Sequence, residues 1–178
     1  MKQNNDKSAI LDLGCARRKV PGTVAVDIYP FEGVDIVHDL NIIPWPIADN
    51  SFDIINAKHI IEHVESIPDF MHEVHRVAKA GAKIIIETPH FTSLDSWADP
   101  THKLHLSYNF TDPFTHGRYL ADRIGEFEVI KKEISFGSFL MTWPARLICG
   151  LFGINFWERY FSFIFRARNI YVELKIIK

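Results

Sequence analysis

Residues 11–15 read LDLGC, a short apolar run that carries one acid and stops at a glycine. A run of this kind is typical of a strand buried within a sheet. Similar runs follow at 23–27 (TVAVD), 34–37 (VDIV), 52–56 (FDIIN) and 83–87 (KIIIE). Strands of this type, joined by helical or long crossovers, form a parallel sheet covered on two sides.

A helix and an edge pair complete the pattern. Residues 67–80 carry Phe70, Met71, Val74 and Val77 at helical spacing, and Gly81 stops the run. Residues 127–136 and 169–177 alternate between apolar and polar, which favours an antiparallel pair at one edge of the sheet.

The first crossover is unusually short. Only Gly14 to Gly22 separate the first two strands, and Pro21-Gly22 is a turn signal. A crossover that contains a full helix needs about a dozen residues or more. The first helix is therefore expected to be absent or cut to a single turn.

Composition places the chain among globular domains. The 178 residues are 47% hydrophobic and 24% charged, which fits one domain over 1–178. The net charge of -2 gives no general attraction to nucleic acid. Cys15 and Cys149 lack metal-ligand spacing and fit a reducing compartment, and Met1 to Ser8 carry no apolar signal segment. We therefore expect a cytoplasmic protein.

Three residues stand at the carboxyl ends of successive strands: Gly14, Asp27 and Asp39. A doubly wound sheet opens its ligand crevice at this edge, and a glycine lets a ligand approach the backbone. An acid after the second strand can accept hydrogen bonds from ribose hydroxyls. An acid after the third strand is placed to accept one from an adenine amino group.

Over about residues 9–110 the chain resembles the small bacterial and archaeal class I S-adenosylmethionine-dependent methyltransferases. The motifs are LDLGC (11–15), VDIYP (26–30), HDLN (38–41), PWPIADNSFDII (44–55), HIIEHV (59–64) and EVHRVAKAGAKIIIETPH (73–90). The resemblance implies an α/β, doubly wound Rossmann-like sheet of order 3-2-1-4-5-7-6 with the last strand antiparallel, and S-adenosyl-L-methionine as cofactor. The cofactor-binding residues it implies are Asp12, Gly14, Asp27, Ile28, Asp39, Leu40, Lys58 and His59.

The sequence departs from the family at the glycine loop. The family's usual Gly-Cys-Gly is Gly14-Cys15-Ala16 here, and Arg17-Arg18-Lys19 stands where the first helix begins. Two interpretations of this basic run are open. In the first, one of the cations pairs with the cofactor's carboxylate; in the second, the run is a solvated loop.

A base for methyl transfer to a hydroxyl is expected after the fifth strand. His90 and His102 are the catalytic candidates, with Asp99 orienting His102. The competing interpretation is that each histidine is buried and structural. In a third interpretation, His90, Asp99, His102 and His105 bind a metal ion. Our main interpretation assigns no metal ligand. Glu62-His63 is expected to cap or pack.

The last third of the chain is rich in aromatic residues. Within the apolar segment 136–165 the longest uncharged stretch, Leu147 to Trp157, is eleven residues, short of the roughly 20 that span a bilayer. We predict a helical insertion at about 138–168, with helix over 139–165 broken near 150–155. It is a lid over a lipophilic acceptor, a dimer face, a membrane-interface helix with Arg146, Arg159, Arg166 and Arg168 at the phosphates, or a cover for the sheet where the first helix is missing.

The sequence therefore predicts methyl transfer from S-adenosylmethionine, with an oxygen of a small-molecule, sugar or lipid-linked acceptor as the target. The alternatives are a non-catalytic S-adenosylmethionine-binding module and a metal-dependent hydrolase that uses His90, His102 and His105. Expected partners are the acceptor, a peripheral membrane contact through 139–165 and a second copy of the chain, with no nucleic acid.

Overall fold

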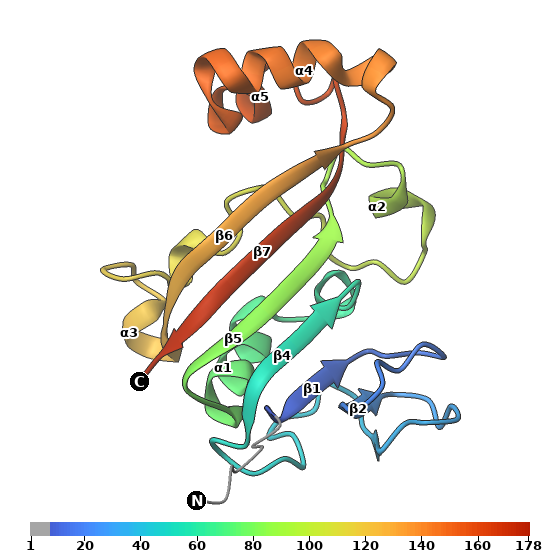
Figure 1. The fold of residues 1–178 in the computed structure, drawn as a ribbon, viewed down its shortest axis with the longest axis vertical. Coiled ribbons are helices and arrows are strands. Elements are labelled where there is room, and N and C mark those ends of the chain that lie inside the picture. The colour runs from blue at the N-terminus through green and yellow to red at the C-terminus, as the bar shows by residue number, and fades with distance from the viewer. Residues whose placement is uncertain (1–7) are drawn as a thin grey trace, which may run out of the picture.

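The computed structural model describes residues 8–178, except for the side chains of 139–141. The expectation for the polar first residues falls mostly outside that range. The described chain forms one seven-stranded mixed sheet, ordered β3-β2-β1-β4-β5-β7-β6, which confirms the predicted order (Figure 1). The strands are β1 (Ile10–Leu13), β2 (Val24–Asp27), β3 (Ile36–Val37), β4 (Phe52–Lys58), β5 (Ala78–Pro89), β6 (Glu126–Phe136) and β7 (Ala167–Ile177).

Strand β7 is the antiparallel member of the sheet. The strands from β3 to β5 pair in parallel, whereas β7 pairs antiparallel with both β5 and β6. This confirms the expected edge pair. It also places the carboxyl ends of β1, β2, β4 and β5 along the same edge of the sheet (Figure 1).

The helices are few and mostly short. The helical elements are η1 (Ile61–His63), α1 (Ile67–Val77), α2 (Asp95–Ala98), η2 (Asp112–Phe114), α3 (Ala121–Ile124), α4 (Phe139–Phe152) and α5 (Ile154–Tyr160). Helix α1 begins after Ser66, whose hydroxyl accepts from the amide of Asp69, and it buries Phe70, Met71, Val74 and Val77 as predicted.

Helix α1 ends three residues earlier than its pattern suggests, because Ala78 to Gly81 extend strand β5. In this extension Lys79 binds the carboxylate of Asp53 on β4 at 2.8 Å. The extension pairs with β4 through an irregular register between Phe52 and Ile54. A cross-strand ion pair of this kind is not visible in a helical hydrophobic pattern.

The segment between β1 and β2 contains no helix, as predicted. The loop is held by side chains instead. The carboxylate of Asp12 accepts from the amide of Val20 at 3.2 Å, and Lys19 pairs with Asp35 at 2.6 Å. One cation of the basic run, Lys19, is therefore already paired with a carboxylate of the protein.

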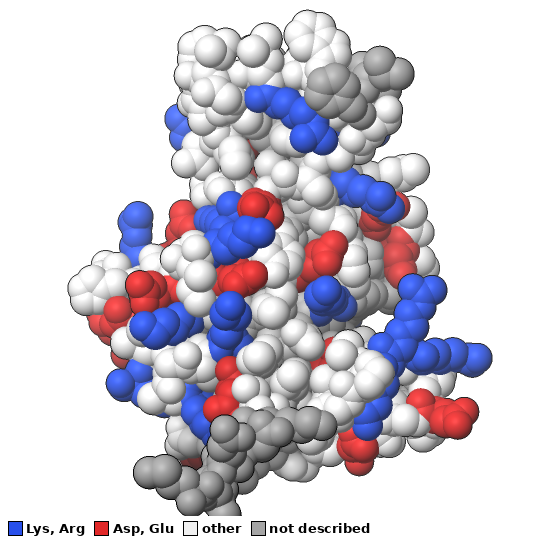
Figure 2. Space-filling view, in the orientation of Figure 1, with Lys and Arg blue, Asp and Glu red and all other residues white. Residues whose placement is uncertain are grey.

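The links between β1, β2, β3 and β4 contain no helix, and the described sheet is covered by helix on one face. On that face Ile84, Ile86 and Val172 are fully buried, with α1 behind them (Figure 1). The opposite face carries cross-strand ion pairs, such as Lys83 with Glu173 at 2.9 Å, and Figure 2 shows red and blue side chains alternating across it. The doubly wound description thus holds for the strand order, while the helix cover in the described chain is one-sided.

Helices α4 and α5 lie beyond the end of the sheet, not over its open face (Figure 1). Their position between β6 and β7 and their break at Gly153, with φ of +86°, agree with the predicted insertion. Trp157 anchors them in a small core with Ala145 and Ala167. The idea that this segment replaces the missing helix cover is wrong. No helix in the described part of the chain is both long and apolar enough to cross a membrane.

Candidate functional site

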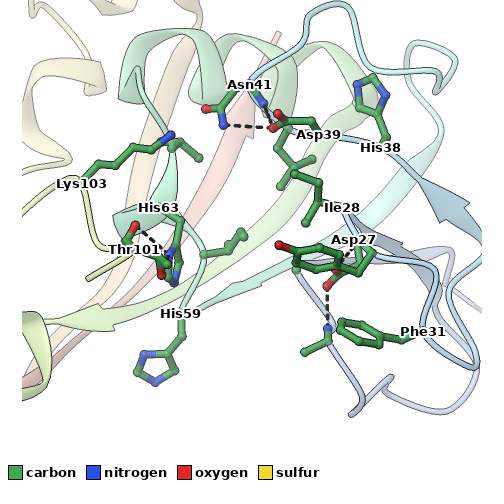
Figure 3. A pocket seen from close by; sticks show the side chains of 16 residues that line it. Asp27, Ile28, Phe31, His38, Asp39, Asn41, His59, His63, Thr101 and Lys103 are labelled. Carbon is green, nitrogen blue, oxygen red and sulfur yellow. Dashed lines mark hydrogen bonds between the residues drawn. The ribbon is translucent and has the colours of Figure 1, made fainter. Parts of the chain in front are cut away.

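A cavity of about 480 Å³ opens at the carboxyl edge of the sheet. Figure 3 shows Asp27 and Phe31 on one side of it, Asp39 and Asn41 on a second, and His63, Thr101 and Lys103 on a third. The volume falls in the range of sites for small organic ligands. Of the residues expected to bind the cofactor, six line the cavity: Gly14, Asp27, Ile28, Asp39, Leu40 and His59.

Gly14 lets strand β1 end directly against the loop that follows β4. Its φ is +66°, and a Cβ there would lie 2.6 Å from Cδ1 of Ile60. No other residue type fits this conformation without displacing Ile60. Ala16 also has a positive φ, +47°, at the position where the family has a second glycine.

Asp27 is held by the loop that follows β1. Its Oδ2 accepts from the amide of Ala16 at 2.8 Å, and its Oδ1 accepts from the amide of Tyr29 at 3.0 Å. Each oxygen keeps a second lone pair. The carboxylate is thus buried, fixed in orientation and still able to accept from two hydroxyl groups.

Asp39, which follows β3, lines the same cavity as Asp27 (Figure 3). Its Oδ1 accepts from the backbone and side-chain amides of Asn41, at 2.9 and 3.0 Å. Leu40 beside it is buried, and its carbonyl accepts from Nε1 of Trp45 at 3.1 Å. These bonds fix the cavity wall at which an adenine ring is expected.

Asp12 and Lys58 do not line the cavity. Burial raises the pKa of Asp12 despite its bond to Val20, so its place is behind the glycine loop. Lys58 is exposed at the end of β4. His59 follows with a φ of +52°, and the nearby Glu62 carboxylate raises its pKa.

His90 is fully buried, and both its ring nitrogens are bonded within the protein. The amide of Thr92 donates to Nδ1 at 3.2 Å, and Nε2 donates to Glu158 on α5 at 3.0 Å. No lone pair is left for a substrate proton. This arrangement makes His90 a structural residue, not the base that the sequence suggested.

Asp99 does not orient His102. Its carboxylate accepts from the amide and the hydroxyl of Thr101, at 2.8 and 2.6 Å. The ring of His102 instead donates from Nδ1 to the carbonyl of Ser96 at 3.1 Å. The orienting group that we assigned to a carboxylate is therefore a backbone carbonyl.

His102 faces a carboxylate that we had assigned to packing. Its Nε2 lies 3.9 Å from Oε1 of Glu62, and this buried oxygen accepts no hydrogen bond. His63 stacks edge-on against His102 at 4.7 Å between ring centroids. One ligand atom from each of these three residues, the Glu62–His63–His102 cluster, lies within 4.8 Å of the other two.

The metal set proposed from sequence does not assemble. His90 is enclosed, and His105 stacks on Trp97 with its Nδ1 bonded to the hydroxyl of Ser96 at 2.9 Å. The signal for the observed cluster was present in the strand order, since η1 follows β4 and the His102 loop follows β5. The ends of adjacent parallel strands meet at one edge, so these two loops had to meet.

A family model described as a methyltransferase domain matches residues 13–86. A search of curated proteins found no match. Among solved structures, a SAM-dependent methyltransferase from Archaeoglobus fulgidus is 19% identical, with a TM-score of 0.60, over 94% of this chain and 86% of that one. A second one, from Mesorhizobium loti, is 14% identical, with a TM-score of 0.60, over 94% and 90%.

A third neighbour carries a different activity in its name. The [4+2]-cyclase SpnF is 14% identical, with a TM-score of 0.59, over 96% of this chain and 75% of that one. These likenesses establish the fold, and the reaction has to be argued from the site.

A methyltransferase-domain match over 13–86, the strand order and the acids at successive strand ends give this chain the fold of the class I S-adenosylmethionine-dependent methyltransferases. S-adenosylmethionine is the cofactor that the matched domain and the fold support. The cavity fits it. Asp27 has free acceptor sites for ribose hydroxyls, and Gly14 leaves its backbone accessible beside them.

Proposed function

We propose that this protein transfers a methyl group from S-adenosylmethionine to a hydroxyl oxygen of an acceptor with a lipid tail. The observation that carries this proposal is an exposed apolar surface at the carboxyl edge of the sheet, the edge at which the cofactor cavity opens. We call it the apolar rim. Its members, each more than half exposed, are Leu94, Trp97, Trp143, Leu147, Leu151, Phe152, Tyr160, Phe163 and Ile164.

Two contacts connect the apolar rim to the end of strand β5. The ring of Phe163 packs against Phe91 with centroids 5.5 Å apart, and Nε1 of Trp97 donates to the carbonyl of Phe91 at 2.7 Å. Soluble monomers rarely expose many large apolar side chains on one surface, and such a surface marks an interaction site. A lipid tail resting there would bring its headgroup to the same edge as the cofactor.

The charges around the rim favour an anionic lipid. Arg168 lies 3.7 Å from Asp95, beside the rim residue Leu94, and residues 137–168 contain four arginines and one acid. That acid, Glu158, is bonded to His90 and only 14% exposed. Figure 2 shows the top of the molecule as mainly white with blue patches. Arginine at an apolar surface is the pattern of proteins that bind phosphate headgroups.

Methyl transfer from this cofactor needs few catalytic groups from the protein. The cofactor supplies a methyl group already activated on a sulfonium, so the residues must align the acceptor and remove a proton. The proton of the acceptor hydroxyl passes to an imidazole of the Glu62–His63–His102 cluster. The oxygen bonds to the methyl carbon as the bond from that carbon to sulfur breaks, which leaves a neutral thioether.

The test has two stages. Calorimetry should show that S-adenosylmethionine and its demethylated product bind the wild type. Incubation with methyl-labelled cofactor and total lipid extract should then place label in the organic phase. Cofactor binding without label in either lipid or aqueous acceptors would overturn the proposal in favour of a cofactor-binding module. Label in aqueous acceptors alone would overturn the lipid assignment.

A further inference from the structure

The Glu62–His63–His102 cluster has the features of a metal site. Glu62 is 1% exposed, its Oε2 accepts from the hydroxyl of Thr88 at 3.0 Å, and its Oε1 has no hydrogen-bond partner. A buried carboxylate oxygen without a partner carries a desolvation cost that a protein rarely leaves uncompensated. His59 Nδ1 lies 3.3 Å from this oxygen but outside hydrogen-bonding geometry.

Both histidines are oriented in the same way. Nδ1 of His102 lies 3.1 Å from the carbonyl of Ser96, and Nδ1 of His63 lies 3.2 Å from the carbonyl of Thr101. A carbonyl can only accept, so in each ring Nδ1 carries the proton and Nε2 keeps its lone pair. A backbone carbonyl on the far nitrogen is the usual support of a histidine that binds a metal.

We propose that Glu62, His63 and His102 bind a first-row transition-metal dication, such as Zn²⁺, Mn²⁺ or Fe²⁺. Two imidazole nitrogens and one carboxylate oxygen suit these ions better than Mg²⁺ or Ca²⁺, which prefer oxygen ligands. The ligand atoms now lie within 4.8 Å of one another. Small side-chain rotations would bring them to the roughly 3.4 Å separation of a tetrahedral site with bonds of about 2.1 Å.

The site is open toward the cofactor cavity, because His63 and Thr101 line that cavity. Three protein ligands leave at least one coordination position for another group. If the proposed methyl transfer holds, that position takes the acceptor hydroxyl. The ion would lower the pKa of the hydroxyl, and its proton would pass to solvent water in place of an imidazole. Binding of the ion itself does not depend on the proposed function.

The experiment is a Co²⁺ titration of the full, untagged chain, followed by absorption between about 500 and 650 nm and by calorimetry with Zn²⁺ and Mn²⁺. We expect one ion per chain and visible bands of a low-symmetry site. Glu62→Gln and His102→Ala should each weaken binding at least tenfold. His105→Ala is the matched control, because His105 is on the same loop but stacks on Trp97. It should bind like the wild type.

Unchanged binding in both ligand variants, or no binding by the wild type, would overturn the metal site. Circular dichroism of each variant checks folding, and His63→Asn provides a third ligand variant should Glu62→Gln fail to fold. Titration with the demethylated cofactor separates the two proposals. Methyl transfer that is equally fast with and without the bound ion refutes only the ion's role in the reaction, whereas ion binding and cofactor binding without any methyl transfer refute the proposed function.

Discussion

Oε1 of Glu158 on helix α5 lies 3.0 Å from Nε2 of His90 at the end of strand β5, and 2.6 Å from the amide nitrogen of Tyr108. One carboxylate thus joins the aromatic helix pair to the sheet and to the loop that follows β5. His90, which the sequence presented as a base, serves as a donor in this link.

Removing this carboxylate should loosen the helix pair. Glu158→Ala leaves two donors without an acceptor, and one of them, on His90, is fully buried. We expect a loss of about 1–3 kcal/mol in the free energy of unfolding, measured by urea denaturation. Glu158→Gln keeps one acceptor oxygen and should lose less. Equal stability of the alanine variant and the wild type would show that the link is not needed.

The same carboxylate predicts a pH dependence. Burial raises its pKa, but hydrogen bonds from His90 and Tyr108 outweigh burial, so the pKa lies below the ordinary value of 4.5. A lowered pKa means that the stabilisation is present above the unfolded-state pKa and is lost as the pH falls through the folded-state pKa. The stability difference between wild type and Glu158→Gln should therefore be constant near neutral pH and shrink below about pH 4. A difference that grows with acidity would contradict this assignment.

The glycine loop offers a paired test. Ala16 is held at a φ of +47°, a conformation that disfavours residues with a Cβ, so Ala16→Gly should stabilise the fold by about 0.5–1 kcal/mol. Gly14→Ala should destabilise it, because the new Cβ would meet Ile60 at 2.6 Å. Thermal unfolding of both variants checks the prediction. Opposite signs would mean that the loop has been placed incorrectly.

The apolar runs located the strands, but their order was implied by the family resemblance alone, whose motifs cover β1 to β5. The absent helix followed from length alone, since the nine residues from Gly14 to Gly22 cannot hold a helix and return to the sheet. The one-sided helix cover has a further cause, because the links from β2 to β3 and from β3 to β4 contain no helix either.

The candidate site was predicted in part. The acids at the strand ends could be predicted from their position in the sequence alone, and Asp27 and Asp39 do line the cavity. The role of each histidine depends on its burial and its hydrogen-bond partners, and these are set by segments far apart in the chain. His90 is occupied by Glu158, 68 residues away, and Glu62 meets His102 across two loops. Local spacing contains none of this information.

Asp27 is the best single test of the cofactor site. Asp27→Ala should weaken binding of the demethylated cofactor by about 1.5–3 kcal/mol, the range for hydrogen bonds to a charged group. The alanine variant also releases the amides of Ala16 and Tyr29, so part of its effect is on the loop. Asp27→Asn keeps the shape and one acceptor oxygen and serves as the control. Unchanged affinity in both variants, measured by calorimetry, would remove the ribose assignment.

The apolar rim predicts binding to anionic membranes. Trp157 is unsuitable as a probe because it is fully buried in the helix-pair core. Phe163 is 77% exposed, and burying a ring of this size in lipid is worth roughly 1.5–3 kcal/mol. Phe163→Glu should therefore lower the partition onto vesicles that contain phosphatidylglycerol by at least tenfold in a sedimentation assay.

Tyr119 provides the matched control for that measurement. It is 69% exposed and precedes α3, which lies at the other end of the sheet from α4 and α5 (Figure 1). Tyr119→Glu should bind vesicles like the wild type, and raising the salt concentration should weaken the binding of both, because the arginines contribute to it. A different result would be a wild type that does not bind vesicles and forms a dimer in solution, with Phe163→Glu a monomer. It would show that the rim pairs two copies of the chain. It would then leave the lipid acceptor without its main support.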